Sequence, residues 1–173
     1  MQYNPSQWKL THSKLLAISG LIWLSIGALL LKLGIQFILF GWTATRFSDE
    51  GYSSLFPYLS QSLAGYENAC LLLVALGILV GYVKGNVVMR KAAQRAYARI
   101  SELPNPAPLF SIYSRANYII LAIMMGLGLT MKFLDISYDV RGFIDTAVGI
   151  ALIQGAIHFF RFSRDASIAK QKF

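Results

Sequence analysis

Hydrophobic residues in this 173-residue chain are gathered into four long blocks instead of alternating regularly with polar residues. Each block has close to the roughly 20 apolar residues that a helix needs to cross the hydrocarbon core of a bilayer. The pattern therefore predicts an all-α integral membrane four-helix bundle, formed by a single domain over residues 1–173. The predicted spans cover approximately residues 15–40, 63–83, 116–134 and 143–160.

A different pattern follows the second span, at residues 86–103. Apolar residues recur there at helical spacing, and basic residues occupy other positions of the same helix. This predicts a basic amphipathic helix that continues from the second span and ends at PNPAP, residues 104–108, because proline cannot continue a helix. Its candidate contacts with anionic lipids or with a partner protein are Arg90, Lys91, Arg95 and Arg99.

Charge adds an orientation to this picture. The chain is 14% charged, well below the roughly 25% that is usual in soluble domains. Its net charge of +8 comes mainly from the first 14 residues, the segment after the second span and the C-terminal tail. Basic loops stay in the cytoplasm, so both termini are expected on the cytoplasmic side. The membrane is expected to be a cell membrane such as the bacterial inner membrane. We expect lipid to be the partner of this positive charge, and no nucleic acid.

Glycines in the spans follow two regular spacings. In the first span, glycines recur every seven residues. The fourth span has the same spacing between Gly142 and Gly149, and the glycines of the second span recur every four residues. Small residues allow membrane helices to approach closely, which predicts helix packing either within one chain or between chains. The helix-packing candidates are Gly20, Gly27, Gly34, Gly77, Gly81, Gly85 and Gly149.

Polar residues inside apolar spans are candidates for function, because they are costly to place in a membrane. One interpretation is a shared outward-facing pathway for a small ion or solute; the other is that each side chain reaches the outer interface separately. The sequence leaves open how deep Lys32 lies in the membrane. A lysine at the bilayer centre without a partner would cost about 3 kcal/mol. The pathway candidates are Lys32, Gln36, Glu67, Asn68 and Asp145.

Motifs for catalysis are missing from the sequence. The two histidines, His12 and His158, are near opposite ends of the chain, and the single cysteine, Cys70, is in an apolar run. Hydrolase, zinc-protease and nucleotide-binding patterns do not occur. We therefore expect no catalytic residue, no metal and no cofactor.

The function expected from these features is that of a non-enzymatic membrane protein. It would act through helix–helix assembly, either as a homo-oligomer or as an accessory subunit of a membrane protein partner. Two alternatives remain open: an oligomeric channel or transporter that uses the polar residues of the outer half, and a lipid-modifying membrane enzyme.

Overall fold

The computed structural model describes residues 9–47, 55–102, 107–108, 126, 130, 133 and 136–171. Almost all of them are helical, as the sequence predicts. The elements in chain order are β1 (Lys9–Leu10), α1 (His12–Phe47), α2 (Phe56–Ser62), α3 (Tyr66–Lys84), the π-helical turn η2 (Gly85–Met89), α4 (Arg90–Ser101), β2 (Ala107–Pro108) and α6 (Tyr138–Gln171).

Three helical stretches are long and apolar enough to cross a membrane, and they are His12–Thr45, Tyr66–Ser101 and Tyr138–Ala166. They contain the predicted first, second and fourth spans. The predicted third span, at residues 116–134, lies outside the described residues apart from three isolated positions. The described chain therefore has a helix of spanning length at three of the four expected spans.

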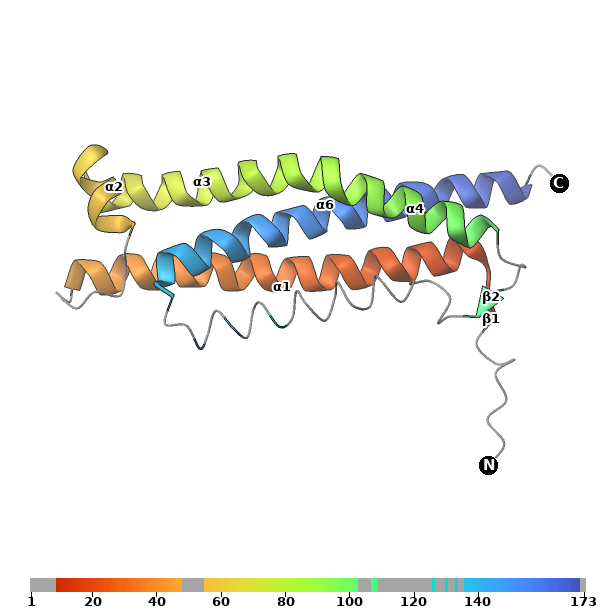
Figure 1. Cartoon of the computed structure of the whole chain (residues 1–173), viewed down its shortest axis with the longest axis horizontal. Helices are drawn as coiled ribbons and strands as arrows, with labels where there is room; N and C mark the ends of the chain where they lie inside the picture. The colour runs from red at the N-terminus through yellow and green to blue at the C-terminus, as the bar shows by residue number, and fades with distance from the viewer. Residues whose placement is uncertain are drawn as a thin grey trace, which may run out of the picture.

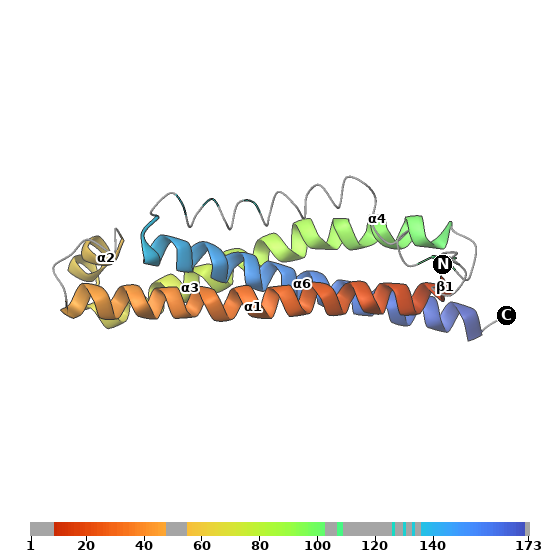
Figure 2. The same ribbon diagram turned by 90° about the horizontal axis from the view of Figure 1, so that it is seen from below.

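The three long helices lie side by side, and α1 runs in the opposite direction to α3 and α6 (Figure 1). The start of α1, all of α4 and the end of α6 gather at one end, while α2 lies at the other end (Figure 2). At the first of these ends β1 pairs antiparallel with β2, with Lys9 opposite Pro108. We call this the basic end and the opposite one the α2 end.

The closest packing in the fold joins α1 to α6 through the heptad glycines. A Cβ atom added to Gly27 would lie 2.9 Å from the carbonyl oxygen of Gly149, and one added to Gly149 would lie 2.8 Å from that of Gly27. Gly34 and Gly142 are related in the same reciprocal way, at 2.8 and 2.7 Å. Because both helices repeat every seven residues and run in opposite directions, the two rows of glycines stay in register.

A pair of serines continues this seam at the basic end. The Ser13 hydroxyl donates to the carbonyl oxygen of Ser163 over 2.9 Å, and the Ser163 hydroxyl donates to that of Ser13 over the same distance. Ser13 comes seven residues before Gly20, and Ser163 comes seven residues after Ala156. The heptad rows therefore meet within one chain from Ser13 to Gly34 of α1.

The glycines of α3 and η2 pack on another face of α6. A Cβ atom on Gly77 would lie 3.1 Å from Thr146 Cγ2, and one on Gly85 would lie 2.9 Å from Ala151 Cα. Thr146 is fully buried between this row and Gly34 of α1. The central helix of the described bundle is therefore α6, and the small residues of both neighbours are directed toward it.

Large hydrophobic side chains are exposed along one band of the bundle, the apolar belt. On the side of the α2 end, we take Leu71 of α3 and Phe40 of α1, which are 69% and 55% exposed, as the edge of the belt, with the exposed Phe47 and Tyr58 beyond it. The Phe40 ring meets the Tyr138 ring edge-on, with 4.9 Å between the centroids. Leu71 is six residues before Gly77, which lies against the start of α6 near Phe143. The two residues are thus level with each other.

The other edge of the belt is equally well matched between helices. Leu21 directly follows Gly20, which lies against Phe160 of α6. Val88 directly precedes Met89, which lies against Gly155 of α6. Ile157, which is 37% exposed, lies at this level on α6. From Leu21 to Phe40 the belt is about 30 Å tall at 1.5 Å per helical residue, which is the thickness of a bilayer's hydrocarbon core.

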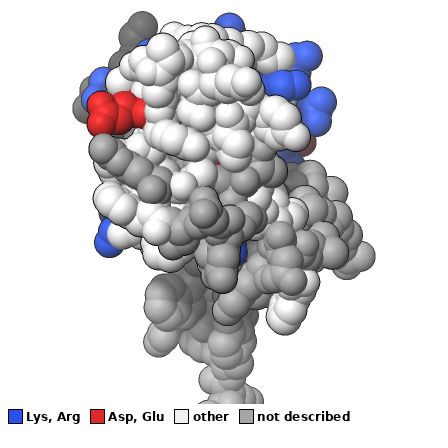
Figure 3. All heavy atoms as spheres, turned by 90° about the vertical axis from the view of Figure 1, so that its left-hand side faces the viewer, with Lys and Arg blue, Asp and Glu red and all other residues white. Residues whose placement is uncertain are grey.

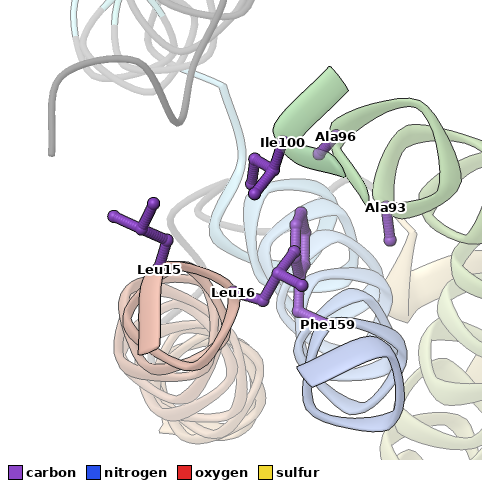
Figure 4. Close-up of a cluster of buried hydrophobic side chains, with 6 residues drawn as sticks. All are labelled: Leu15, Leu16, Ala93, Ala96, Ile100 and Phe159. Carbon is purple, nitrogen blue, oxygen red and sulfur yellow. The ribbon is translucent and has the colours of Figure 1, made fainter. Parts of the chain in front are cut away.

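Beyond the belt, the predicted amphipathic helix folds against the protein. Figure 4 shows the apolar side of α4, formed by Ala93, Ala96 and Ile100, next to Leu16 and Phe159. The turn η2 joins α3 to α4 without a break. The apolar face that would lie on a lipid surface is therefore buried among α1, α4 and α6, and the basic residues are on the side of α4 that remains.

Packing at both ends also makes the helices longer than the predicted spans. The first span is predicted at residues 15–40, but α1 covers His12–Phe47; the fourth is predicted at 143–160, but α6 covers Tyr138–Gln171. The extra residues make their own contacts: Ser13 hydrogen-bonds Ser163, Trp42 packs against the cluster around Phe56, and Asp139 is fully buried. The length of the apolar run is therefore not the length of the helix.

A buried carboxylate joins α2 to α6. The backbone N–H groups of Leu55 and Phe56 donate to Asp139 Oδ2 over 2.6 and 3.0 Å. The first N–H groups of a helix have no partner within the helix, and here a residue distant in sequence satisfies two of them. Asp139 is fully buried, and so is Phe56, which packs with Ile38 and Leu73.

The glycine seam can be tested with two identical substitutions. We expect Gly34→Ala to lower the free energy of unfolding by about 1–3 kcal/mol, because the new Cβ would lie 2.5 Å from the Thr146 nitrogen. Gly126→Ala is the matched control, since a Cβ there meets nothing within 4 Å. Thermal unfolding in detergent compares the two. Equal stability of both variants would contradict the close approach of α1 and α6.

The Asp139 cap makes a separate prediction. Asp139→Ala leaves the N–H groups of Leu55 and Phe56 without their acceptor, so we expect their hydrogen exchange to become about tenfold faster or more. Asp165→Ala removes an exposed acid from the same helix and should leave both rates unchanged. Exchange measured by mass spectrometry on the peptide that contains α2 decides the question, and unchanged protection in the first variant would exclude the cap.

Candidate functional site

Lys32 and Gln36 lie on the side of α1 that faces away from the glycine seam. Both side chains are exposed, and neither has a hydrogen bond or ion pair within the part of the chain that the structure describes. Lys32 comes eleven residues after Leu21 and eight before Phe40, so it is about 16 Å and 12 Å from the two edges of the apolar belt. The lysine is therefore near mid-depth.

Asp145 is also inside the belt, but it has a partner on its own helix. Its Oδ2 atom is 3.9 Å from Nε of Arg141, one turn earlier in α6. The guanidinium of Arg141 also lies over the ring of Phe37, 4.3 Å from the centroid. Asp145 itself is only 9% exposed, so the arginine connects a buried carboxylate to the aromatic rings near the edge of the belt.

Glu67 and Asn68 lie at a different depth. Both are exposed in the first turn of α3, on the α2-end side of Leu71. Asn68 Nδ2 donates to the carbonyl oxygen of Leu63 over 2.9 Å. The two residues line a hollow of about 310 Å³ at the turn between α2 and α3, together with Ala64, Gly65 and Tyr66.

The five pathway candidates therefore separate into three groups. Lys32 is about 18 Å deeper than Glu67 when both are measured along the helix axes. Asp145 faces Arg141 within α6, whereas Lys32 and Gln36 are directed outward from α1. Arg141 was not among the candidates predicted from the sequence, although its i, i+4 spacing from Asp145 is the usual one for helical ion pairs.

Exposed basic side chains are concentrated at the basic end, beyond the belt. In the view from the α2 end, the described residues show one acidic group on one side, and most basic atoms lie toward the outline (Figure 3). Of the four predicted contact residues on α4, three are exposed, and Arg99 is partly buried and has an interaction partner. The exposed basic residues of this end are Lys14, Arg90, Lys91, Arg95, Arg161 and Arg164.

Metal-ligand chemistry has no support in the geometry. The described residues contain no group of three His, Cys, Asp or Glu side chains close enough to hold a metal ion. Cys70 is a free thiol that is half-buried against the cluster around Phe56. The predicted pathway candidates in the belt are thus a lysine, an amide and the acid of one ion pair, and Lys84 of α3 is a further exposed lysine nearer the basic end.

Comparison of the chain with protein-family models, with curated proteins and with solved structures gave no match. The class of the protein rests on its fold. Three apolar helices of spanning length, packed through small residues, are characteristic of helical membrane proteins.

The ion pair in the belt makes a testable prediction. Arg141→Leu leaves the Asp145 carboxylate buried without a partner, and we expect this to cost about 3–5 kcal/mol of stability. Asp145→Asn removes the buried charge and should cost clearly less. The double variant should therefore be more stable than Arg141→Leu alone, as measured by thermal unfolding in detergent. If the double variant loses the sum of the two single losses, the pair carries no coupling.

Proposed function

We propose that this chain is a multi-pass protein of a cell membrane, with the apolar belt in the hydrocarbon core and the basic end in the cytoplasm. The height of the belt supports its placement, because about 30 Å matches the core. The exposed Lys and Arg side chains beyond one edge support the orientation, since basic segments are retained on the cytoplasmic side. A bacterial inner membrane fits this arrangement.

The proposed role is lateral assembly with another membrane protein through the outward face of α1. A single observation carries it: Lys32 is exposed near the middle of the belt with no partner among the described residues. A lysine at this depth facing lipid costs about 3 kcal/mol on insertion scales. Its side chain reaches about 6 Å, which leaves the charge inside the core when the nearer edge is about 12 Å away.

The partner best suited to this face is a transmembrane helix with a carboxylate or an amide at mid-depth. A second copy of this chain is less suitable, because Asp145 faces Arg141 and Asp139 holds α2. The heptad glycines are occupied by α6, so they no longer favour a homo-oligomer. These contacts support the role of an accessory subunit over self-association.

The predicted ion or solute pathway has weaker support. It requires Lys32, Glu67 and Asp145 to line one cavity, yet they differ in depth or in direction. The hollow at the α2–α3 turn contains Glu67 and Asn68 but not the other candidates. The geometry of the described residues therefore favours contact between helices over permeation.

The assembly can be tested by photo-crosslinking in native membranes. A photoreactive residue at position 36, one turn from Lys32, should give an adduct whose mass is not a multiple of the chain's mass. With Lys32→Leu in the same chain, we expect the yield to fall at least about fivefold, because the charge that selects the partner is lost. A photoreactive residue at Leu79, exposed in the belt on α3, is the matched control and should give only lipid adducts.

Three results would contradict the proposal. An adduct of twice the chain's mass would indicate a homo-oligomer instead. A crosslink from position 36 to another part of the same chain would show that the chain itself covers this face. Equal yields with and without Lys32 would show that the lysine does not select the partner.

A further inference from the structure

Three nitrogen-bearing side chains come from neighbouring positions where α4 and α6 leave the apolar belt at the basic end. Gly155 of α6 lies against Met89, since an added Cβ would be 3.2 Å from the methionine side chain. Arg90 follows Met89 at the start of α4, while His158 and Arg161 come one and two turns after Gly155. The positive charges of Arg90 and Arg161 both act on the His158 imidazole.

Charge and hydrogen bonding are both incomplete in this group. His158 is nine-tenths buried, and its Nε2 atom has no hydrogen-bond partner among the described residues. The exposed guanidinium groups of Arg90 and Arg161 have no carboxylate within ion-pair distance in the same part of the chain. Converging positive charges and an unpaired buried donor are unfavourable, and an anion bound between the two helices relieves both.

The location of the group indicates which anion it would hold. Ile157, which directly precedes His158, is at the edge of the belt, so the two arginines are at the level where phospholipid phosphates lie. On the belt side, Val87 and Val88 are about half exposed beside this group. A ligand with a phosphate and an acyl chain would therefore meet guanidinium groups at one end and aliphatic side chains at the other.

We infer that Arg90, His158 and Arg161 form a binding site for the phosphate of an anionic phospholipid. The two arginine forks, from different helices, bind phosphate oxygens, and the imidazole donates from Nε2. The site shares only Arg90 with the lipid contacts predicted along α4. It rests on the proposed placement of the belt in a membrane but not on assembly through α1.

The test uses the full chain in a nonionic detergent, titrated with short-chain phosphatidylglycerol. Phosphatidylcholine of the same chain length and inorganic phosphate are titrated in parallel. We expect phosphatidylglycerol to bind at least about tenfold more tightly than either, because only it combines an acyl chain with an uncompensated phosphate charge. Arg90→Gln and Arg161→Gln should each weaken it about tenfold, the loss of one charge-assisted contact.

Two further variants separate a built site from general attraction. Arg164→Gln removes an exposed arginine one turn further from the belt and should change the affinity less than about twofold. His158→Gln keeps a donor and should bind better than His158→Phe, which keeps only the bulk of the ring. Circular dichroism of each variant confirms that it is folded.

Several outcomes would overturn the inference. An equal loss for Arg164→Gln and Arg161→Gln would mean diffuse charge attraction. Equal binding of inorganic phosphate would mean a site for free phosphate, and equal binding of phosphatidylcholine would mean no selection for anionic lipid. A chain that stays monomeric in water without detergent would instead contradict the membrane placement, so the two failures can be told apart.

Discussion

The contact on which the rest of this fold depends is the antiparallel seam between α1 and α6. Two rows of small residues with the same seven-residue repeat bring the helix backbones so close that an added Cβ at Gly27 would lie 2.9 Å from a carbonyl oxygen. Because α1 packs on one face of α6 and the glycines of α3 pack on another, α6 is the central helix. Small residues are required along these rows, and the large hydrophobic side chains are left for the outer surface, where they form a belt as tall as a bilayer core.

Outside the belt, the chain packs in the manner of a soluble protein. At the basic end, the apolar side of α4 is buried with Leu16 and Phe159, and the serine pair closes the seam. At the α2 end, the Asp139 carboxylate accepts hydrogen bonds from the first backbone N–H groups of α2, and Phe56 packs with Ile38 and Leu73. These two clusters hold the long helices together beyond the apolar segment. The basic side chains of α4 are therefore carried by a helix that packs against α1 and α6, not by a helix that lies flat on lipid.

The polar groups in and around the belt differ chiefly in how well the chain itself satisfies them. Asp145 has Arg141, which in turn has the ring of Phe37. Lys32 has no partner within the described chain, and the buried His158 has an unpaired Nε2 between two arginines. Polar groups that a fold leaves unsatisfied in apolar surroundings are the natural places for another molecule to bind, and these are the two places where we propose a partner helix and a phospholipid.

By itself, the sequence determined the three long helices of the described chain and the rows of small residues along them. The apolar blocks, the glycine repeats at seven and four residues and the basic amphipathic segment are local patterns, and each is visible within a few turns of the chain. Only the tertiary structure decided which faces meet. Rows of equal spacing can pair in many ways, so the match of Gly27 with Gly149, the cap from Asp139 to α2 and the burial of the apolar side of α4 could not be read from periodicity. The depth of Lys32 within the belt was also decided only by the tertiary structure. A run of apolar residues does not mark where the belt begins and ends. Neighbouring helices held in a fixed register do mark it, because their exposed apolar side chains must begin and end at the same level.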